Sequence, residues 1–320
     1  MSGGGTEIKS RLKRRHKEFQ INMSNMPSMQ DLLEAGVHFG HQVRRWNPKM
    51  REFIFGARDG VHVINLEFTV DKLAAACEFV KKVGEAGGTI IFLGSKKQAR
   101  SIVVDAAKRV DAMYIAERWI GGLLTNFEQT TKNLRKLQDL KVKKENGEFS
   151  DRTKKELLLI DRDIAKLTRF YGGVEKMEKM PDALFVIDVR REENACREAM
   201  KKEIPVVAIC DTNADLSLVT YPIPGNDDAI KAIQIVTDAV ADAYQEGRSI
   251  FKKKSAQEKV ELAGEKVEEK VKKGIISPLP KATKEEEMKV SQVQNEVEKE
   301  IAEVEENKRE ERRAVSKTNI

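Results

Sequence analysis

The sequence predicts an α/β fold in which helices cover both faces of a parallel sheet. Short apolar segments rich in β-branched residues recur along the middle of the chain, and most are separated by segments with helical periodicity. Strands that are apolar on both faces are typical of parallel sheets buried under helices. A third observation, a long stretch without a strand pattern, predicts a helical insertion into this domain.

Five short segments are the expected strands of this sheet. They are residues 62–67, 89–95, 113–118, 183–189 and 205–211. Residues 70–85 and 96–110 have the spacing of connecting helices, and Gly87 and Gly88 end the first of them. The last helix is expected from Asp227 to about Gln245, because apolar residues line one stripe of it and acidic residues stand near its N-terminus.

The predicted insertion, at about residues 126–175, is an antiparallel coiled-coil α-hairpin. Apolar residues recur at helical spacing on both sides of the polar turn KKENGEFSD. They are Leu134, Leu137 and Leu140 before the turn, and Leu157, Ile160, Ile164, Leu167 and Tyr171 after it. The charged outer faces fit either a solvated hairpin or an arm that binds a partner, and the sequence leaves both open.

The segment from Leu32 to Met50 is the most unusual part of the chain. Leu32 and Leu33 are expected on the buried side of a short helix over residues 31–35, with Gly36 just past its end and a loop beyond. In that loop, arginines and a lysine stand beside a tryptophan, and this combination suits phosphates and bases.

The charge is distributed unevenly over the 320 residues. The net charge is +6, but residues 23–251 hold 35 basic and 34 acidic residues, whereas residues 1–22 hold six basic and two acidic ones. The expected organisation is a basic, disordered extension (1–25), an α/β domain (26–250) and a charged tail (251–320) that is disordered or partly helical. Any polyanion must therefore be met by local patches or by the tails.

Several classes of protein are not indicated. Cys77, Cys196 and Cys210 are odd in number and far apart, which favours a reducing cytosol over a disulfide framework or a zinc ribbon. Apolar runs reach only about six residues, against the ~20 that span a membrane, and no secretory signal follows the basic N-terminus. No membrane partner is expected.

No catalytic motif was found, and an enzyme is not expected. GSKKQARS, which follows the second strand, offers a helix N-terminus and cations to a phosphate but matches no nucleotide-binding motif. Asp188 and Asp211 each end a strand, at the edge where parallel sheets usually bind ligands. These two carboxylates fit a catalytic pair, a cation site or ordinary helix caps.

Five distinctive segments follow one another in the order LLEAGVHFGHQVRRWNPKMREFIFGARDGVHVINLE, GTIIFLGSKKQA, ERWIGGLLTNF, PDALFVIDVRREENACREAMKKEIPVVAICDTNAD and IPGNDDAI. Together they resemble the bacterial and organellar family of ribosomal protein S2, over residues from about Met29 to Ser249. ADLSLVTYPIPGNDD departs from that pattern, because Leu216 stands where relatives usually carry proline.

The resemblance implies a Rossmann-like or flavodoxin-like parallel sheet with a protruding coiled-coil hairpin. It also implies a structural constituent of the small ribosomal subunit in translation, cytoplasmic, with no required cofactor and no small-molecule substrate. The partners it implies are small-subunit rRNA and neighbouring small-subunit proteins, including ribosomal protein S1, which such proteins help to dock.

The residues expected to bind RNA are mostly cations in loops or at a helix start. They are Arg44, Arg45, Trp46, Lys49, Arg51, Lys96, Lys97, Arg100, Arg118 and Trp119. Trp46 either stacks on a base or braces its loop, and Gly121 with Gly122 either admits RNA closely or makes a tight turn. A basic N-terminal extension that threads into RNA is a further hypothesis.

Two histidines and two aspartates are the expected metal ligands, namely His38, His41, Asp188 and Asp211. Imidazole and carboxylate groups suit zinc, and magnesium is the second candidate ion. The alternative is that the histidines are structural and form hydrogen bonds to these aspartates.

Overall fold

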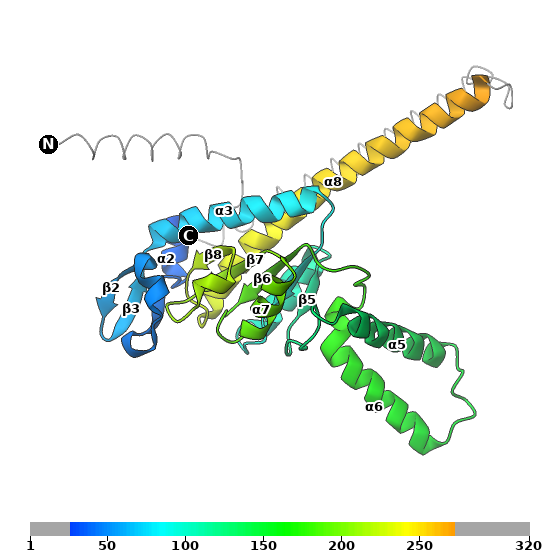
Figure 1. Cartoon of the computed structure of the whole chain (residues 1–320), viewed down its shortest axis with the longest axis horizontal. Helices are drawn as coiled ribbons and strands as arrows, with labels where there is room; N and C mark the ends of the chain where they lie inside the picture. The colour runs from blue at the N-terminus through cyan, green and yellow to red at the C-terminus, as the bar shows by residue number, and fades with distance from the viewer. Residues whose placement is uncertain (1–25, 273–320) are drawn as a thin grey trace, which may run out of the picture. The chain divides into compact units, whose positions relative to one another are not determined.

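The computed structural model describes the backbone of residues 26–272 and the side chains of residues 26–255 (Figure 1). The chain divides into two compact units, Met1–Ser255 and Ala256–Ile320, and the fold below is that of the first. The basic extension, with its predicted threading into RNA, lies outside the described residues, and so does the tail beyond Lys272.

A five-stranded parallel sheet forms the centre of this unit. In spatial order its strands are β5 (Met113–Ile115), β4 (Ile90–Leu93), β6 (Ala183–Ile187), β7 (Val206–Cys210) and β8 (Tyr221–Pro224). Every residue of β4, β6 and β7 is buried, as expected for strands apolar on both faces. Strand β8 was not predicted, because Pro222 and Pro224 argue against a central strand; β8 is an edge strand, where proline is tolerated.

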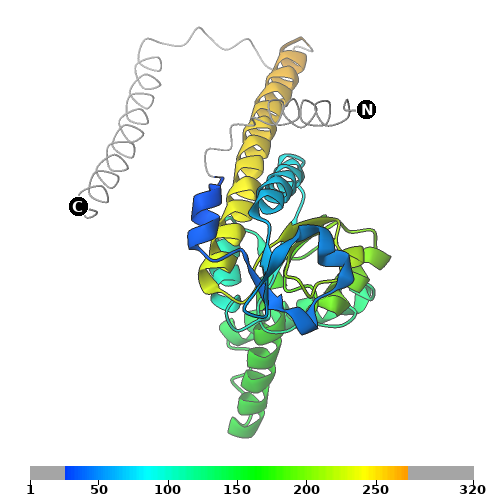
Figure 2. The same ribbon diagram turned by 90° about the vertical axis from the view of Figure 1, so that its left-hand side faces the viewer.

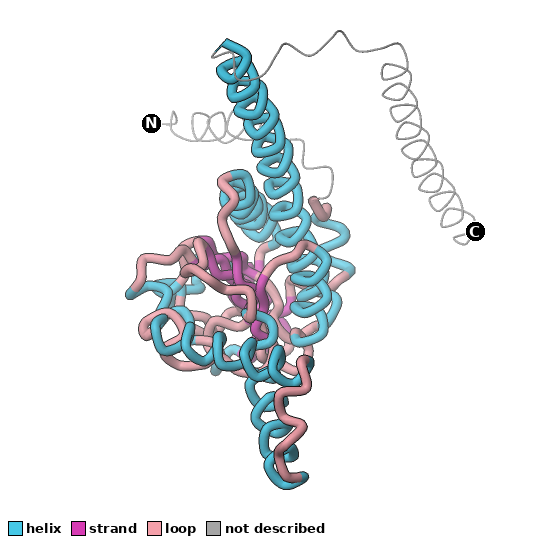
Figure 3. The backbone as a smooth tube through the Cα atoms, turned by 90° about the vertical axis from the view of Figure 1, so that its right-hand side faces the viewer, coloured by secondary structure: helices cyan, strands magenta, loops and turns pink. Residues whose placement is uncertain are grey.

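The two faces of the sheet belong to two separate apolar cores. The covering helices are α3 (Leu66–Glu85), α4 (Arg100–Arg109), α7 (Glu193–Lys201) and α8 (Ile230–Lys272). Phe92 and Phe185 pack with α3, α4 and α8, whereas their strand neighbours Leu93 and Val186 pack with α7. Figure 3 shows the strands (magenta) enclosed by helices. The predicted α/β class is confirmed, and α8 continues well past its expected end at Gln245.

Two glycines allow α3 and α8 to cross with their backbones in contact. A Cβ atom on Gly84 would lie 2.8 Å from the carbonyl oxygen of Tyr244, and one on Gly247 would lie 2.2 Å from the carbonyl oxygen of Lys81. A side chain at either position would therefore force the two helices apart.

A second, antiparallel sheet precedes the parallel one and appears in blue in Figure 2. Its spatial order is β1 (Phe39–Gln42), β3 (Val61–Ile64) and β2 (Ile54–Arg58). The expectation of a loop after Gly36 is therefore wrong for Phe39–Gln42, whereas residues 43–53 lie outside the strands. Residues 62–67 do not belong to the parallel sheet. Asp59 and Gly60 both have positive φ, and this two-residue turn pairs β2 with β3 as a hairpin.

The short helix expected near residue 31 is α2 (Met29–Glu34). Ser28 and Asp31 form a capping box at its start, and Gly36 follows its end with φ +75°. Leu32 is fully buried, but Leu33 is 52% exposed, because neighbouring helical positions point about 100° apart. The prediction was right for the first leucine and wrong for the second.

Two helices, α5 (Phe127–Glu145) and α6 (Lys154–Tyr171), occupy the predicted insertion and form a hairpin (Figure 1). Leu134 and Leu137 are buried at its base, in the same core as α7. Further out, the Nζ atom of Lys144 lies 2.7 Å from Asp161 Oδ1 and links the two helices. Their supercoiling as a coiled coil stays a prediction.

Candidate functional site

The segment between β1 and β2 combines buried anchors with exposed charges. It forms two 3₁₀ turns, η1 (Val43–Arg45) and η2 (Pro48–Phe53). Met50 is fully buried, and the backbone N–H of Asn47 donates to the carbonyl oxygen of Thr212 at 2.7 Å. The segment is thus fixed against the loop after β7.

Four exposed cations, Arg44, Arg45, Lys49 and Arg51, project from this segment, and we call them the cationic loop. The Nζ atom of Lys49 lies 2.8 Å from Oδ1 of Asp215, a contact that lowers the pKa of Asp215 to about 2. Among the described side chains, Arg45 and Arg51 have no ion-pair partner. Most of the charge of the cationic loop is therefore available to a polyanion.

Trp46 forms the predicted bracing contact, and its predicted stacking on a base stays a prediction. Its ring centroid lies 5.6 Å from that of the buried His62, so the ring braces the small sheet. The residue is nevertheless 37% exposed and lines a surface hollow together with Arg44, Arg45 and Arg190. Bracing and base stacking are compatible here, because a ring has two faces.

Lys96 lies in a cluster of carboxylates at the carboxyl edge of the parallel sheet. Its Nζ atom is 2.7 Å from Asp227 Oδ1, 2.6 Å from Asp228 Oδ1 and 3.5 Å from Asp188 Oδ2. Burial alone would lower the pKa of Lys96, but the carboxylates outweigh it and raise that pKa. Because its charge is already matched, these contacts disfavour the expected contact of Lys96 with phosphate, which stays a prediction.

Asp227 is the most deeply buried carboxylate around Lys96, with 1% of its surface exposed. Burial, together with the negative charges of Asp188 and Asp211, raises the pKa of Asp227 to about 7. The cluster therefore holds a carboxyl group that changes its charge near neutral pH.

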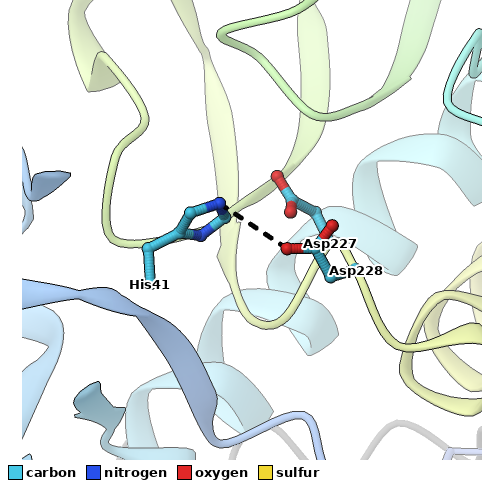
Figure 4. Close-up of side chains that lie close together, drawn as sticks. All are labelled: His41, Asp227 and Asp228. Carbon is cyan, nitrogen blue, oxygen red and sulfur yellow. Dashed lines mark ion pairs between the residues drawn. The ribbon is translucent and has the colours of Figure 1, made fainter. Parts of the chain in front are cut away.

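His41 reaches the same cluster from β1. Its Nε2 atom lies 3.6 Å from Asp228 Oδ2 (Figure 4). Its Nδ1 atom lies 2.9 Å from Asp211 Oδ2. Contact with Asp211 is the largest cause that raises the pKa of His41; burial opposes it, and the charges of Asp227 and Asp228 add to it. The cluster thus favours the imidazolium form.

Only part of the predicted metal-ligand set comes together. His41 and Asp211 are in contact, but Asp188 lies beside the lysine of the cluster, and His38 Nδ1 is buried without a hydrogen-bond partner among the described residues. The ligand atoms that lie within 4.8 Å of one another belong to His41, Asp227 and Asp228. Asp211 also accepts the backbone N–H of His41, so the alternative of a structural histidine is equally supported.

The other predicted RNA-binding residues differ in their surroundings. Lys97 and Arg118 are exposed, whereas Arg100, where α4 begins, forms an ion pair with Glu117 at 3.3 Å. Trp119 is only 6% exposed and packs in the core, and it also lines a hollow at the base of the α5–α6 hairpin, so its expected role as an RNA contact stays a prediction.

One carboxylate organises the loop between β5 and α5. Glu198 on α7 accepts the indole N–H of Trp119 and the backbone N–H groups of Gly122, Leu124 and Thr125 at 2.8 to 3.2 Å. Burial would raise the pKa of Glu198, but these donors outweigh it and lower that pKa. Gly122 has φ +88°, so the tight-turn interpretation is favoured over close approach of RNA.

No catalytic arrangement is assembled among the described side chains. In the loop after β4, the backbone N–H and the hydroxyl of Ser95 both donate to Glu192, so these two donors are already paired within the protein. Burial raises the pKa of Cys77 and Cys196 to about 12, which makes both thiols poor nucleophiles. Within the described residues, no helix has the length and apolarity needed to cross a membrane.

Comparisons with known proteins agree with one another. A family model described as Ribosomal protein S2 matches residues 32–247. The chain is 46% identical over 227 residues to the small ribosomal subunit protein uS2 of Dictyoglomus thermophilum, which covers 71% of this chain and 92% of that protein. It is 50% identical over 222 residues to the protein of the same name from Hahella chejuensis, with 69% and 88% covered. For the protein of that name from Nocardia farcinica the identity is 48% over 220 residues, with 69% and 77% covered.

Proposed function

Because the chain belongs to the ribosomal protein S2 family, we propose that it binds small-subunit rRNA through the cationic loop and helps to dock ribosomal protein S1. It is a structural constituent of the small ribosomal subunit in the cytoplasm, and not an enzyme. Its other partners are neighbouring small-subunit proteins.

The observation that carries the rRNA proposal is the fixed geometry of the cationic loop. Met50 and Asn47 hold the backbone, so binding does not need to order the whole segment. Arg44, Arg45 and Trp46 line one hollow, which places cations beside a partly exposed ring. Phosphate contacts from arginine next to a stacked base are the usual chemistry of RNA binding.

Salt dependence tests this proposal. The triple variant Arg44→Gln, Arg45→Gln and Arg51→Gln is expected to bind small subunits that lack this chain more weakly, with the slope of log K against log salt reduced by roughly two to three. Arg58→Gln is the matched control, because Arg58 is 88% exposed on β2 and does not line this hollow. An unchanged slope in the triple variant would contradict the proposal.

The docking of ribosomal protein S1 is assigned to the small sheet. Phe55 on edge strand β2 is 80% exposed, and Phe39 on the opposite edge strand β1 is 52% exposed. Exposed aromatic residues are typical of protein interfaces. Phe55→Ser is therefore expected to reduce the amount of ribosomal protein S1 retained on subunits; Leu159→Ser, at a residue 53% exposed on α6, serves as the control.

A bound metal ion remains part of the proposal, with revised ligands. His41, Asp227 and Asp228 offer one imidazole and two carboxylates, a donor set that fits zinc better than magnesium. The Nζ atom of Lys96 occupies the space between the carboxylates, so the ion would have to displace it. The ion would then supply the positive charge that Lys96 now supplies.

A further inference from the structure

A hollow of about 380 Å³ lies at the base of the α5–α6 hairpin and has no part in the cationic loop. Its walls are largely apolar: Leu167 and Phe170 are partly buried, and Tyr171 is 7% exposed. The hydroxyl of Tyr171 accepts a hydrogen bond from Asn133 Nδ2 at 3.1 Å. On another wall, the indole N–H of Trp119 donates to Glu198. The hollow is therefore rigid and preformed.

The charges at the hollow are all positive. Arg118 and Lys166 line it, both are exposed, and neither has an ion-pair partner among the described side chains. The nearest acidic residue along the chain, Glu117, is already matched, because its Oε2 atom lies 3.3 Å from Arg100 and 2.9 Å from Arg169. Two unpaired cations beside an apolar hollow complement a ligand with a flat apolar part and a negative charge.

Gly121 lines this hollow, and neither its backbone conformation nor its packing requires a glycine. A Cβ atom there would meet nothing within 4 Å, and the residue does not have the positive φ that favours glycine. Its neighbour Gly122 does have a positive φ and needs to be glycine for the turn. A larger side chain at Gly121 would therefore reach into free space on the side of the hollow without straining the fold.

We propose that this hollow binds one unpaired nucleotide of the small-subunit RNA, with its base against Phe170 and its phosphate at Arg118 and Lys166. Proteins read unpaired RNA bases by stacking them on aromatic side chains and pairing their phosphates with cations. A peptide fits less well, because the backbone N–H groups of the adjoining loop already donate to Glu198. This inference rests on the proposed function, since it adds a second RNA contact to the same chain.

The test uses small subunits assembled with the full chain, in which the reactivity of each rRNA base toward a chemical probe is measured. We expect one or a few unpaired bases to be protected by the wild-type chain and to become fully reactive with Gly121→Leu or Phe170→Ala. Binding to subunits that lack the chain should weaken roughly tenfold. Leu159→Ala, at a residue that is 53% exposed on α6 and does not line the hollow, is the matched control.

The outcomes separate this inference from the proposed function. If Gly121→Leu and Phe170→Ala are incorporated with wild-type protection of every base, the nucleotide site is refuted while the ribosomal role stands. A cross-link from the hollow to a neighbouring protein in place of RNA would also overturn it. If the wild-type chain itself fails to join small subunits, the proposed function fails first. Gly121→Leu keeps the test decisive should Phe170→Ala not fold.

Discussion

Replacing Lys96 by methionine should destabilise the protein in a manner that depends on pH. Among the described side chains, the change removes the one ion-pair partner of Asp227, a side chain that is 1% exposed, and leaves an unbranched apolar side chain of similar length to fill the space. Breaking a buried ion pair from one side costs about 3–5 kcal/mol. We expect the lower end, about 3 kcal/mol at pH 8, because Asp228 is 55% exposed and keeps contact with water.

The pH dependence follows from the raised pKa of Asp227. In the folded chain this pKa is about 7, against 3.8 for the ordinary group, so the folded state binds the proton more tightly. Its contribution to stability is complete below pH 3.8 and is lost as the pH rises through 7, a difference of roughly 4 kcal/mol. At pH 5 Asp227 is already protonated and has less need of Lys96, so the cost of Lys96→Met should fall to about 1 kcal/mol.

Urea unfolding of the full chain, followed by far-UV circular dichroism at pH 5 and pH 8, measures both quantities. Lys97→Met is the matched control, because Lys97 is exposed and should change stability by no more than about 0.5 kcal/mol. Adding Asp227→Asn to Lys96→Met should recover most of the loss at pH 8, since the uncompensated charge is then absent. A cost below about 1 kcal/mol at pH 8, or the same cost at both pH values, would refute the reasoning.

Three further results are expected. Glu198→Ala removes the acceptor of four N–H groups and should lower the free energy of unfolding by about 1–3 kcal/mol in urea at pH 7. Because folding lowers the pKa of Glu198, its contribution to stability is present above pH 4.5 and fades as the pH falls below that value. An equal cost at pH 3.5 would contradict this account. Gly173→Ala places a Cβ atom 2.1 Å from the Tyr114 carbonyl oxygen and should cost about 1–3 kcal/mol, visible as a lower Tm, whereas Gly121→Ala should leave the Tm unchanged. His41→Ala should weaken zinc binding in calorimetry by at least roughly tenfold, and equal affinity would argue for a structural histidine.

The sequence predicted the parallel sheet well because its strands are buried on both faces. Runs such as Ile90–Leu93 and Ala183–Ile187 are short, apolar throughout and rich in β-branched or aromatic residues, which is typical of strands buried on both faces. The small sheet was harder to predict, because β1 and β2 contain exposed and polar residues and lack alternation. The Asp59–Gly60 pair was the available signal, since this dipeptide is typical of two-residue hairpins.

The candidate site shows a different limit of sequence analysis. Asp188 and Asp211 were expected at one edge because the strand ends of a parallel sheet share it, and His41 of β1 contacts Asp211 there. The involvement of Asp227 and Asp228 was missed, because acidic residues before a helix already have an ordinary explanation in the helix dipole. Lys96 was predicted to contact phosphate because it is a cation in a loop before a helix. The sequence gives no indication that three carboxylates from distant segments surround it.

The contact between α3 and α8 joins the first long helix of the chain to its last. Gly84 and Gly247 stack backbone on backbone, so neither can acquire a side chain first, and no gradual path of single substitutions leads away from the pair. The family match ends at residue 247, at this contact. A chain that stopped before Gly247 would lose this backbone contact between its first long helix and its last.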